Sequence, residues 1–481
     1  MLKKHRRGEA LSMTDAPSTP SLLRTGVGAL ALSVLVASLG TSAANVALPT
    51  IAADLEGTFA QTQWVALAYL LAMTATSLTV GHLGDLLGRR RVLLAGIAVF
   101  SVAAILCAIA PTLGMLIAAR ALQGVGAAVM MALPLARARD TVPPERLGAI
   151  MGLLGTTAAV GTASGPALGG LLITVAGWPA IFAVMAPLGL LAAVLLGRPH
   201  GEIRHTAGPR GRFDVAGVLL LTAAVALYTL GATDPGTDDS WPTALLLTAA
   251  VATAVLFGVW ESRAAHPILP LALLTVRAIS LGAVLNLIVG TVMMSTLVVG
   301  PFFLAGALHL APAAIGATMA AGPVASILSG VVAGRAVDRF GARGMTTVGL
   351  TAMIAGSLAL ALLPAAGGLP GYITGTVLLA PGYQLFLAAN NTSVLGATPA
   401  ERRGVTSGLL GLSRNLGLVT GASVLAALFA SSAGATAIAD ASAETLTAAL
   451  RTTFLATTAM LVVAVLLSLV PSRTNPQTVE R

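Results

Sequence analysis

Long apolar runs separated by short polar breaks dominate the sequence. Runs of about 20 apolar residues recur between residues 25 and 470, and about 20 such residues are needed for a helix to cross a bilayer. Segments exposed to lipid have to be helices or strands of a closed barrel, because the bilayer core offers no water to backbone groups. Runs of this length are too long for barrel strands, so the pattern predicts an all-α membrane protein.

The breaks divide the chain into fourteen predicted transmembrane helices. Their approximate limits are 25–49, 62–84, 92–110, 112–137, 147–175, 178–197, 214–232, 242–260, 278–307, 311–335, 345–364, 370–396, 402–432 and 447–470. Residues 1–24 are basic and polar, and no apolar segment with a cleavage site follows them directly. We therefore expect a disordered cytoplasmic tail there and a second tail at 471–481.

The charge composition agrees with a membrane protein and argues against a nucleic-acid partner. Of the 481 residues, 56% are hydrophobic and 9% are charged, whereas soluble domains carry about 25% charged residues. The net charge of +9 does not form one patch, because the cations sit in short clusters between apolar runs. Such clusters suit contact with lipid head groups.

The cations also predict an orientation. Every second predicted loop is basic, as at Arg89 to Arg91, whereas the loops between carry acids, such as Asp54 and Glu56, or no charge. Basic loops stay in the cytoplasm. We therefore expect an even number of spans, with both termini on the cytoplasmic side of a bacterial inner membrane.

The chain repeats itself at a nearly constant spacing. Gly81, Asp85 and Gly88 recur 253 residues later as Gly334, Asp338 and Gly341, and ERLGAIMGLLG at 145–155 recurs 256 residues later as ERRGVTSGLLG. This predicts two parallel six-helix halves, 25–197 and 278–470, joined by a linker, 198–277, that holds two extra helices. Parallel halves around a central site are typical of transporters.

The stretch GHLGDLLGRRR at 81–91 resembles the loop motif G-x-L-x-D-x-x-G-R-R-R of the major facilitator superfamily, without departure at the defined positions. The resemblance implies a gate and conformational switch between the second and third helices. Glycine permits close helix approach and a tight turn, and an acid favours the positive end of a neighbouring helix. The implied switch residues in the two halves are Gly81, Asp85, Gly88, Arg89, Arg90, Asp338, Arg339 and Gly341.

Arg120 lies inside the predicted fourth helix. A charge at mid-bilayer costs about 2.5–3.5 kcal/mol on insertion scales, so such residues usually face a cavity. Arg120, Gln123 and Gly124 are similar to the superfamily's fourth-helix motif, which implies a role in proton transfer. A structural arginine bonded to backbone carbonyls of the first helix is the alternative.

The fifth predicted helix resembles the antiporter motif of the superfamily. The matching residues are Gly161, Gly165, Pro166, Gly169 and Gly170. The resemblance implies export by exchange. Glycines that permit close helix packing, with a bend at the proline, are an alternative that is compatible with it.

ANVALPTI at 44–51 resembles the first-helix motif of the fourteen-span drug/proton antiporters, with one departure. Many members have an aspartate where this chain has Gly40, so the favoured embedded carboxylate is missing. No acid lies well inside a predicted span. Proton coupling would then have to use acids near the ends of spans, such as Asp54 and Glu56, or work around Arg120 and Gln123.

The second half contributes a further embedded cation, Arg414, beside Asn415. Its repeat partner is Ala158, so Arg414 breaks the internal symmetry, and by the same cost it is expected to face the cavity. Amides in the spans are candidate cavity-lining groups, although each taken alone suits an interhelical hydrogen bond equally well. These amides are Asn45, Asn286, Gln384, Asn390 and Asn391.

The sequence offers no sign of catalysis. Its six histidines have no metal-ligand spacing, and no P-loop pattern occurs, so we expect no enzyme activity, metal or cofactor. We predict a monomeric exporter of amphipathic drugs or antibiotics that works by proton antiport and alternating access. Two embedded arginines without an embedded acid favour neutral or anionic substrates over dications. The alternative is export of an endogenous metabolite or a self-made antibiotic.

Overall fold

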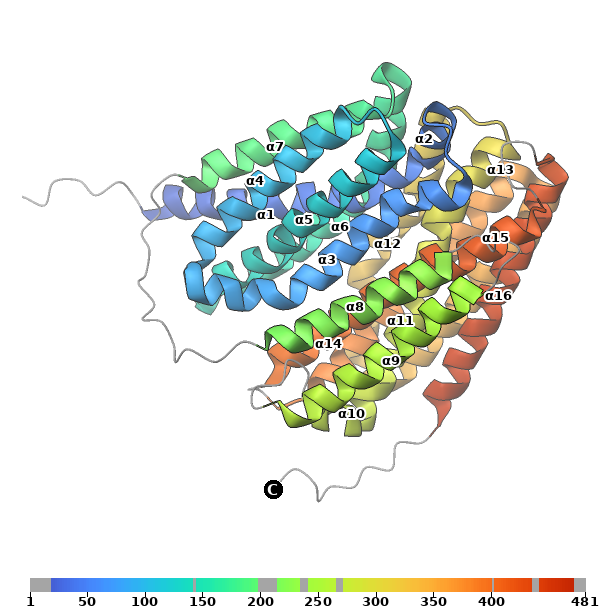
Figure 1. The fold of residues 1–481 in the computed structure, drawn as a ribbon. Coiled ribbons are helices and arrows are strands. Elements are labelled where there is room, and N and C mark those ends of the chain that lie inside the picture. Colours follow the sequence, from blue (N-terminus) through green and yellow to red (C-terminus); the bar gives the residue numbers. More distant parts are fainter. Residues whose placement is uncertain are drawn as a thin grey trace, which may run out of the picture.

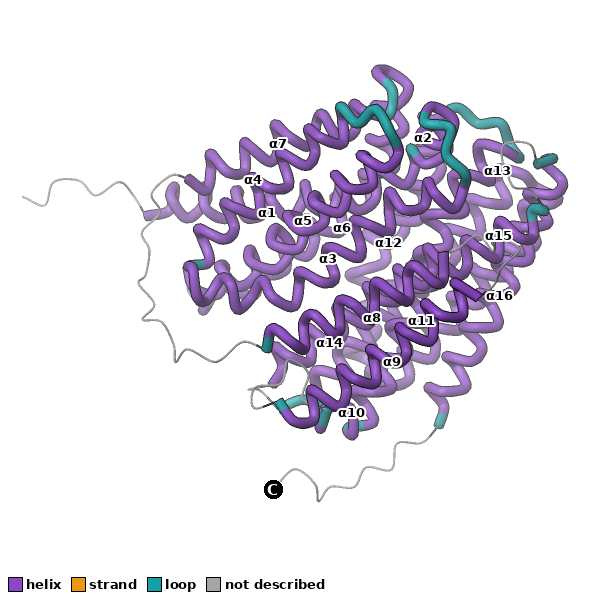
Figure 2. Tube along the Cα trace, in the orientation of Figure 1, coloured by secondary structure: helices purple, strands orange, loops and turns teal. Residues whose placement is uncertain are grey.

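The regular structure of the described part of the chain is entirely helical. The computed structural model describes residues 19–141, 144–197, 214–233, 241–264, 271–399, 402–434 and 441–470, and Figures 1 and 2 show helices joined by short loops in these ranges. Eleven of the helices are long and apolar enough to cross a membrane. The prediction of an all-α membrane protein is confirmed.

The first helix group contains the helices before residue 198. They are α1 (Thr19–Val46), α2 (Leu48–Asp54), α3 (Phe59–Leu87), α4 (Arg89–Ala108), α5 (Leu113–Thr141), α6 (Pro144–Ala176) and α7 (Pro179–Gly197). α5 packs against α3 and α4, and α1 packs against α6 and α7. These helices gather on one side of the molecule, in blue to green in Figure 1.

The second helix group begins after residue 270. It contains α10 (Ala272–Thr275), α11 (Arg277–Gly306), α12 (Pro312–Phe340), α13 (Ala342–Gly396), α14 (Arg403–Thr420), the π-helical turn η2 (Gly421–Leu425), α15 (Ala426–Ser432) and α16 (Ala443–Leu469). α8 (Val215–Thr233) and α9 (Trp241–Arg263) lie between the groups in sequence and pack on each other. α8 also contacts α3 of the first group and α14 of the second.

α13 is a helical hairpin rather than one rod. Gly368 has a non-helical backbone (φ 50°, ψ −126°), which glycine adopts at little cost. The glycines of one arm face the other arm closely, since a Cβ at Gly349 would lie 2.6 Å from the nitrogen of Phe386, and one at Gly375 would lie 2.8 Å from the nitrogen of Leu360. The two arms correspond to the predicted spans 345–364 and 370–396.

Two other predicted spans differ in detail from the structure. The predicted span 25–49 is interrupted at Ala47, where α1 ends and α2 begins with Pro49 in its first turn, a position that suits proline because the ring needs no hydrogen bond there. The predicted span 402–432 contains η2, a π-helical turn between α14 and α15. Single π turns of this kind often occur at functional sites.

The internal repeat has a structural counterpart at two loops. Gly88 joins α3 to α4 with φ 91° and ψ 120°, and Gly341 joins α12 to α13 with φ 85° and ψ 146°. Both positions lie in a region that residues with a side chain rarely adopt. The end of the bundle that carries these two glycines is called the Gly88 end below, and the opposite end, which carries α2, is called the α2 end.

Substituting Gly341 tests this backbone requirement. Gly341→Ala is expected to destabilise the protein by about 1–3 kcal/mol, because the positive φ strains any residue with a Cβ. The measurement is the thermal unfolding midpoint in detergent. Gly344→Ala is the matched control, since it lies in the helical part of the same segment and a Cβ there meets open space. Equal midpoints for the two variants would contradict the prediction.

The two helix groups meet closely at the α2 end. The ring of Phe59, at the start of α3, lies edge-on to Phe302 of α11 with centroids 4.5 Å apart, and Phe429 of α15 lies 6.0 Å from Phe59. All three rings are buried. In this conformation an aromatic contact therefore closes the molecule between the groups at the α2 end.

Candidate functional site

Arg120 is the largest fully buried side chain of the first helix group, with 1% of its surface exposed. Its Nε donates to the carbonyl of Val65 at 2.9 Å, its Nη2 donates to the carbonyl of Gly40 at 3.1 Å, and its Nη1 donates to Oε1 of Gln123 at 2.6 Å. These bonds connect α5 with α3 and α1. The arrangement matches the structural alternative, in which Arg120 bonds to a carbonyl of the first helix.

Aromatic rings complete the surroundings of Arg120. Its Cζ lies 4.1 Å from the ring centroid of Tyr69 and 5.7 Å from that of Phe182, distances at which an aromatic face attracts a cation. A Cβ at Gly40 would lie 3.1 Å from Oη of Tyr69, so a carboxylate at this position would lie in the same cluster. This chain has Gly40 where the resembled motif often has an aspartate. Backbone carbonyls, the amide of Gln123 and two aromatic rings surround the Arg120 cation instead of a carboxylate.

The arginines of the loop at 81–91 fasten the first group at the Gly88 end. Arg89 donates to the carbonyl of Ala136 at 3.1 Å, and Nη2 of Arg90 donates to the carbonyl of Gly197 at 2.7 Å. The Gly197 carbonyl belongs to the last turn of α7, where the helix dipole favours a cation. The predicted switch residues Gly81 and Asp85 lie in α3, but their side-chain surroundings fall outside the described residues.

The equivalent residues of the second group are more open. Asp338 and Arg339 are exposed at the end of α12, and the guanidinium of Arg339 lies 5.3 Å from the ring of Phe340. No hydrogen bond or ion pair is present for these two side chains among the described residues. The sequence repeat therefore predicts the two loops but not their different contacts.

The antiporter-like residues of α6 face α1. A Cβ at Gly161 would lie 2.8 Å from the carbonyl oxygen of Leu35, and one at Gly169 would lie 2.8 Å from that of Ala43; one at Gly165 would clash with Ser42. Glycine therefore permits backbone contact along this seam. Pro166 lies inside α6 and is buried. The same contact recurs in the second group, where Gly417 and Gly421 face carbonyls of α11.

Gly170, the last residue of the motif, faces the other helix group instead. A Cβ at Gly170 would lie 3.0 Å from Cα of Gly316 in α12, and a Cβ at Gly316 would lie 3.0 Å from Cα of Gly170. α6 and α12 thus make a direct backbone contact near the α2 end. This contact and the ring of Phe59 are two of the features that hold the groups together there, and α2 also contacts α11.

Two of the candidate cavity amides are interhelical connectors. Nδ2 of Asn286 donates to the carbonyl of Leu410 at 2.7 Å, and Nδ2 of Asn390 donates to the carbonyl of Gly282 at 3.1 Å. Both side chains are buried, so the interhelical alternative describes them. Asn45 is fully buried and donates to the carbonyl of Thr41 at 3.3 Å, while its Oδ1 has no partner.

Gln384 and Asn391 are half-buried on α13, and the described residues give neither of them a side-chain hydrogen bond.

Asp54 and Glu56 are exposed at the α2 end. Asp54 accepts a hydrogen bond of 3.0 Å from Nε1 of the buried Trp178, and Glu56 has a positive φ of 51°. Neither acid is among the hydrogen-bond partners of Arg120, which are all neutral groups.

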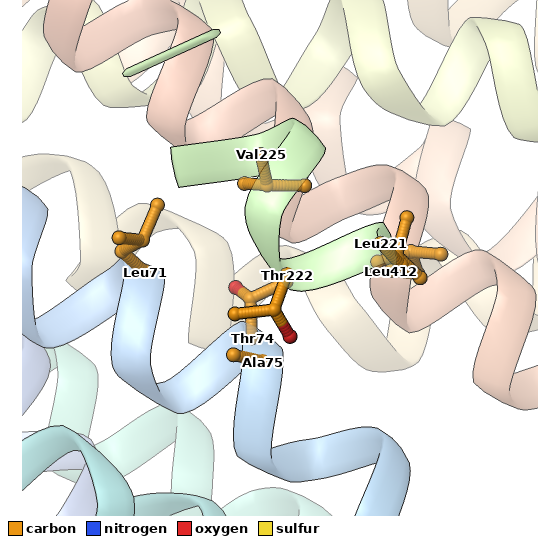
Figure 3. A pocket seen from close by; sticks show the side chains of 7 residues that line it. All are labelled: Leu71, Thr74, Ala75, Leu221, Thr222, Val225 and Leu412. Carbon is orange, nitrogen blue, oxygen red and sulfur yellow. The ribbon is translucent and has the colours of Figure 1, made fainter. Parts of the chain in front are cut away.

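A small apolar pocket lies where α3, α8 and α14 meet (Figure 3). Its lining residues are Leu71, Thr74, Ala75, Leu221, Thr222, Val225 and Leu412. Near it, Tyr228 of α8 donates to Oγ1 of Thr420 at 3.1 Å. This pocket could not be predicted from the sequence, because the extra helix α8 shows no polar motif that would place it beside α3 and α14.

The structure also adds polar residues that pattern reading missed. Gln63 of α3 is 3% exposed and its Nε2 has no hydrogen-bond partner. Glu261 is 3% exposed and lies in the last turn of α9, which continues to Arg263, beyond the predicted span end at 260. The expectation concerned acids well inside a span, so it did not address this buried acid in the last turn of α9. A polar residue in or at the end of an apolar run was the signal available in both cases.

A family model places the chain among known transporters. The model of the Major Facilitator Superfamily matches residues 30–300 and 279–481. Of the solved structures, the xylose transporter XylE from E. coli in a partially occluded inward open conformation has a TM-score of 0.63 and covers 94% of this chain and 98% of its own, at 12% identity. At that identity the likeness concerns the fold alone.

Two relatives are more similar in sequence. The riboflavin transporter RibZ of Clostridioides difficile is 30% identical over 84% of this chain and 87% of its own length. The tetracenomycin C resistance and export protein of Streptomyces glaucescens is 31% identical over 86% of this chain and 76% of its own length. Proteins similar to this chain thus carry the names of both a vitamin transporter and an antibiotic exporter.

Proposed function

Because the chain belongs to the major facilitator superfamily, a family of non-enzymatic membrane transporters, we propose that it is a secondary active exporter of amphipathic drugs or antibiotics. The observation that carries the proposal is the packing of the α6 glycines. These glycines pack on α1, and Gly170 packs on Gly316 of the other group, so the motif associated with exchange lies at the contact that has to open and close.

We propose fourteen spans for this exporter. The eleven apolar helices include α13, whose two arms count separately, and α3 and the shorter α8 supply the rest. Residues 25–197 and 278–470 then form the two halves, and 198–277 forms the linker with α8 and α9. Because the arginine-rich loops share the Gly88 end, that end and both termini are cytoplasmic in this proposal.

The proposed mechanism is alternating access. The two helix groups rock about a central site, and closure at the α2 end alternates with closure at the Gly88 end. Phe59, Phe302 and the Gly170–Gly316 contact support closure at the α2 end. Inward proton movement supplies the driving force. Arg120, Gln123, Arg414, Asn415, Asp54 and Glu56 remain the candidates for coupling.

The second candidate function is transport of an endogenous metabolite or a self-made antibiotic. The name of the riboflavin transporter, at 30% identity, favours it, since the same fold and motifs would serve. Riboflavin and tetracenomycin C are therefore included beside synthetic drugs in the substrate panel described next.

Transport in proteoliposomes under an imposed pH gradient tests the proposed function. We expect substrate to accumulate in the more acidic compartment against its own concentration gradient. A protonophore that collapses the pH gradient should abolish this accumulation. Ethidium, which carries one positive charge, serves as the cation and nalidixate as the anion in the panel. Transport of every panel member at a rate indifferent to the gradient would overturn proton antiport.

A further inference from the structure

Arg414 lies in α14 without a partner. The guanidinium is half-buried, its Nε is buried without a hydrogen bond, and the described residues give it no hydrogen bond or ion pair. A charge inside a membrane span is costly and is usually met by another charge, by carbonyls or by water in a cavity. An unpaired arginine at such a position is therefore free to bind an anion.

Arg120 shows what a structural arginine looks like in the same protein. It is 1% exposed and uses Nε, Nη1 and Nη2 in three hydrogen bonds. Each of its three nitrogens is bonded, and burial keeps its two remaining N–H groups away from a ligand in this conformation. The two embedded arginines that the sequence treats alike are thus different in kind, and of the two only Arg414 is partly exposed and without a hydrogen bond.

The space beside Arg414 is open. Successive residues of a helix are 100° apart, so Ser407, Gly411, Arg414 and Leu418 share one face of α14. A Cβ at Gly411 would meet no atom within 4 Å, and Ser407 is exposed. At Ser407 and Gly411 this face is therefore not covered by another helix, whereas Leu418 packs on the core.

The neighbours of α14 place this open face between the two helix groups. On one side Gly417 faces the carbonyl of Leu287 in α11. On the other side Leu412 lines the pocket with α3 and α8 (Figure 3). The face of Arg414 lies between these two sides, and α3 belongs to the first group. Asn415, which is 7% exposed, adds an amide whose Oδ1 has no partner.

We propose that Arg414 binds the acidic group of an anionic amphipathic substrate, a carboxylate or a comparable anion, and thereby selects anions. A planar guanidinium matches a carboxylate with two parallel hydrogen bonds. The apolar pocket formed by α3, α8 and α14 supplies a wall for the apolar part of the molecule. The inference rests on the proposed function and narrows its substrate class.

The test compares each acid with its uncharged ester. Cells carrying wild-type protein are challenged with a panel of carboxylate, methyl-ester and cationic amphiphiles that includes nalidixate, its methyl ester and ethidium. Extrusion of the protected members is then measured in proteoliposomes. For Arg414→Gln we expect anion transport to fall about tenfold or more, as for the loss of a charged hydrogen bond, with ester transport unchanged. Arg414→Lys should retain an intermediate rate.

Controls separate this role from folding, from lipid binding and from the proposed function. Arg451→Gln removes an exposed cation of α16 and should change nothing. The Arg414→Gln effect should persist in vesicles of phosphatidylcholine alone, since an effect seen only with phosphatidylglycerol would assign the anion to lipid and overturn the inference. The inference would also be overturned if the wild-type protein protected cells against no anion, or if Arg414→Gln reduced transport of acid and ester equally. If the wild-type protein protected cells against none of the compounds, whatever their charge, the proposed function itself would be rejected instead.

Discussion

Gly170→Val is expected to impair transport strongly while leaving the protein folded. The added side chain would meet the backbone of Gly316, because even a Cβ at Gly170 would lie 3.0 Å from Cα and 3.1 Å from N of that residue. Backbone atoms cannot move aside as a flexible side chain can, so α6 and α12 have to separate. The expected result is a molecule that cannot close at the α2 end, with a transport rate reduced about tenfold or more, which corresponds to about 1.4 kcal/mol.

Gly155→Val is the matched control on the same helix, because a Cβ at Gly155 meets open space. A cysteine at Phe302 reports the opening, since Phe302 is buried against Phe59 and the native Cys107 is buried. With Phe302→Cys in both backgrounds, a membrane-impermeant maleimide should label the Gly170→Val protein faster than the Gly155→Val protein. Equal labelling and equal transport would show that the α6–α12 contact is not needed for closure.

Arg120→Lys is expected to lower both transport and thermal stability, although it keeps the positive charge. Lysine lacks the planar fork, so it cannot reach the carbonyls of Gly40 and Val65 and the amide of Gln123 together. Each buried carbonyl left without a partner costs about 1–3 kcal/mol. We expect the thermal unfolding midpoint in detergent to fall, and transport to fall about tenfold or more.

Two transport assays separate the structural role of Arg120 from a proton-transfer role. Gradient-driven uptake into vesicles requires protons, whereas exchange of substrate across the membrane without a pH gradient does not. A structural role predicts that Arg120→Lys reduces both rates to a similar extent. Loss of gradient-driven transport alone, with an unchanged unfolding midpoint, would restore the proton-transfer role. Arg451→Lys makes the same exchange at an exposed position and should have no effect.

Most of the fold could be predicted from the sequence, because long apolar runs allow few structures in a bilayer. The repeat also located the turns, since glycine alone suits the backbone at Gly88 and Gly341. The break at Ala47 and the π turn η2 were not predicted. Both lie inside continuous apolar runs, and hydropathy does not register a change of backbone hydrogen bonding.

The candidate site was harder to predict, because its residues depend on neighbours far along the chain. The sequence identified Arg120 and Arg414 by the same argument, the cost of an embedded charge. It could not show that Val65 and Gly40 would satisfy the first while the second stayed unpaired. Asn286 and Asn390 were likewise undecided until their acceptors, carbonyls on other helices, were known.

The neutral surroundings of Arg120 have a consequence for energy coupling. Its acceptors are two backbone carbonyls and an amide oxygen, and these groups do not gain or lose protons in the physiological range. The fastening of α1, α3 and α5 is therefore the same in an acidic and in a neutral compartment. A pH difference across the membrane therefore leaves these three bonds of Arg120 unchanged. Under the proposed proton antiport, conformational change driven by protons would have to begin at a group other than these three acceptors.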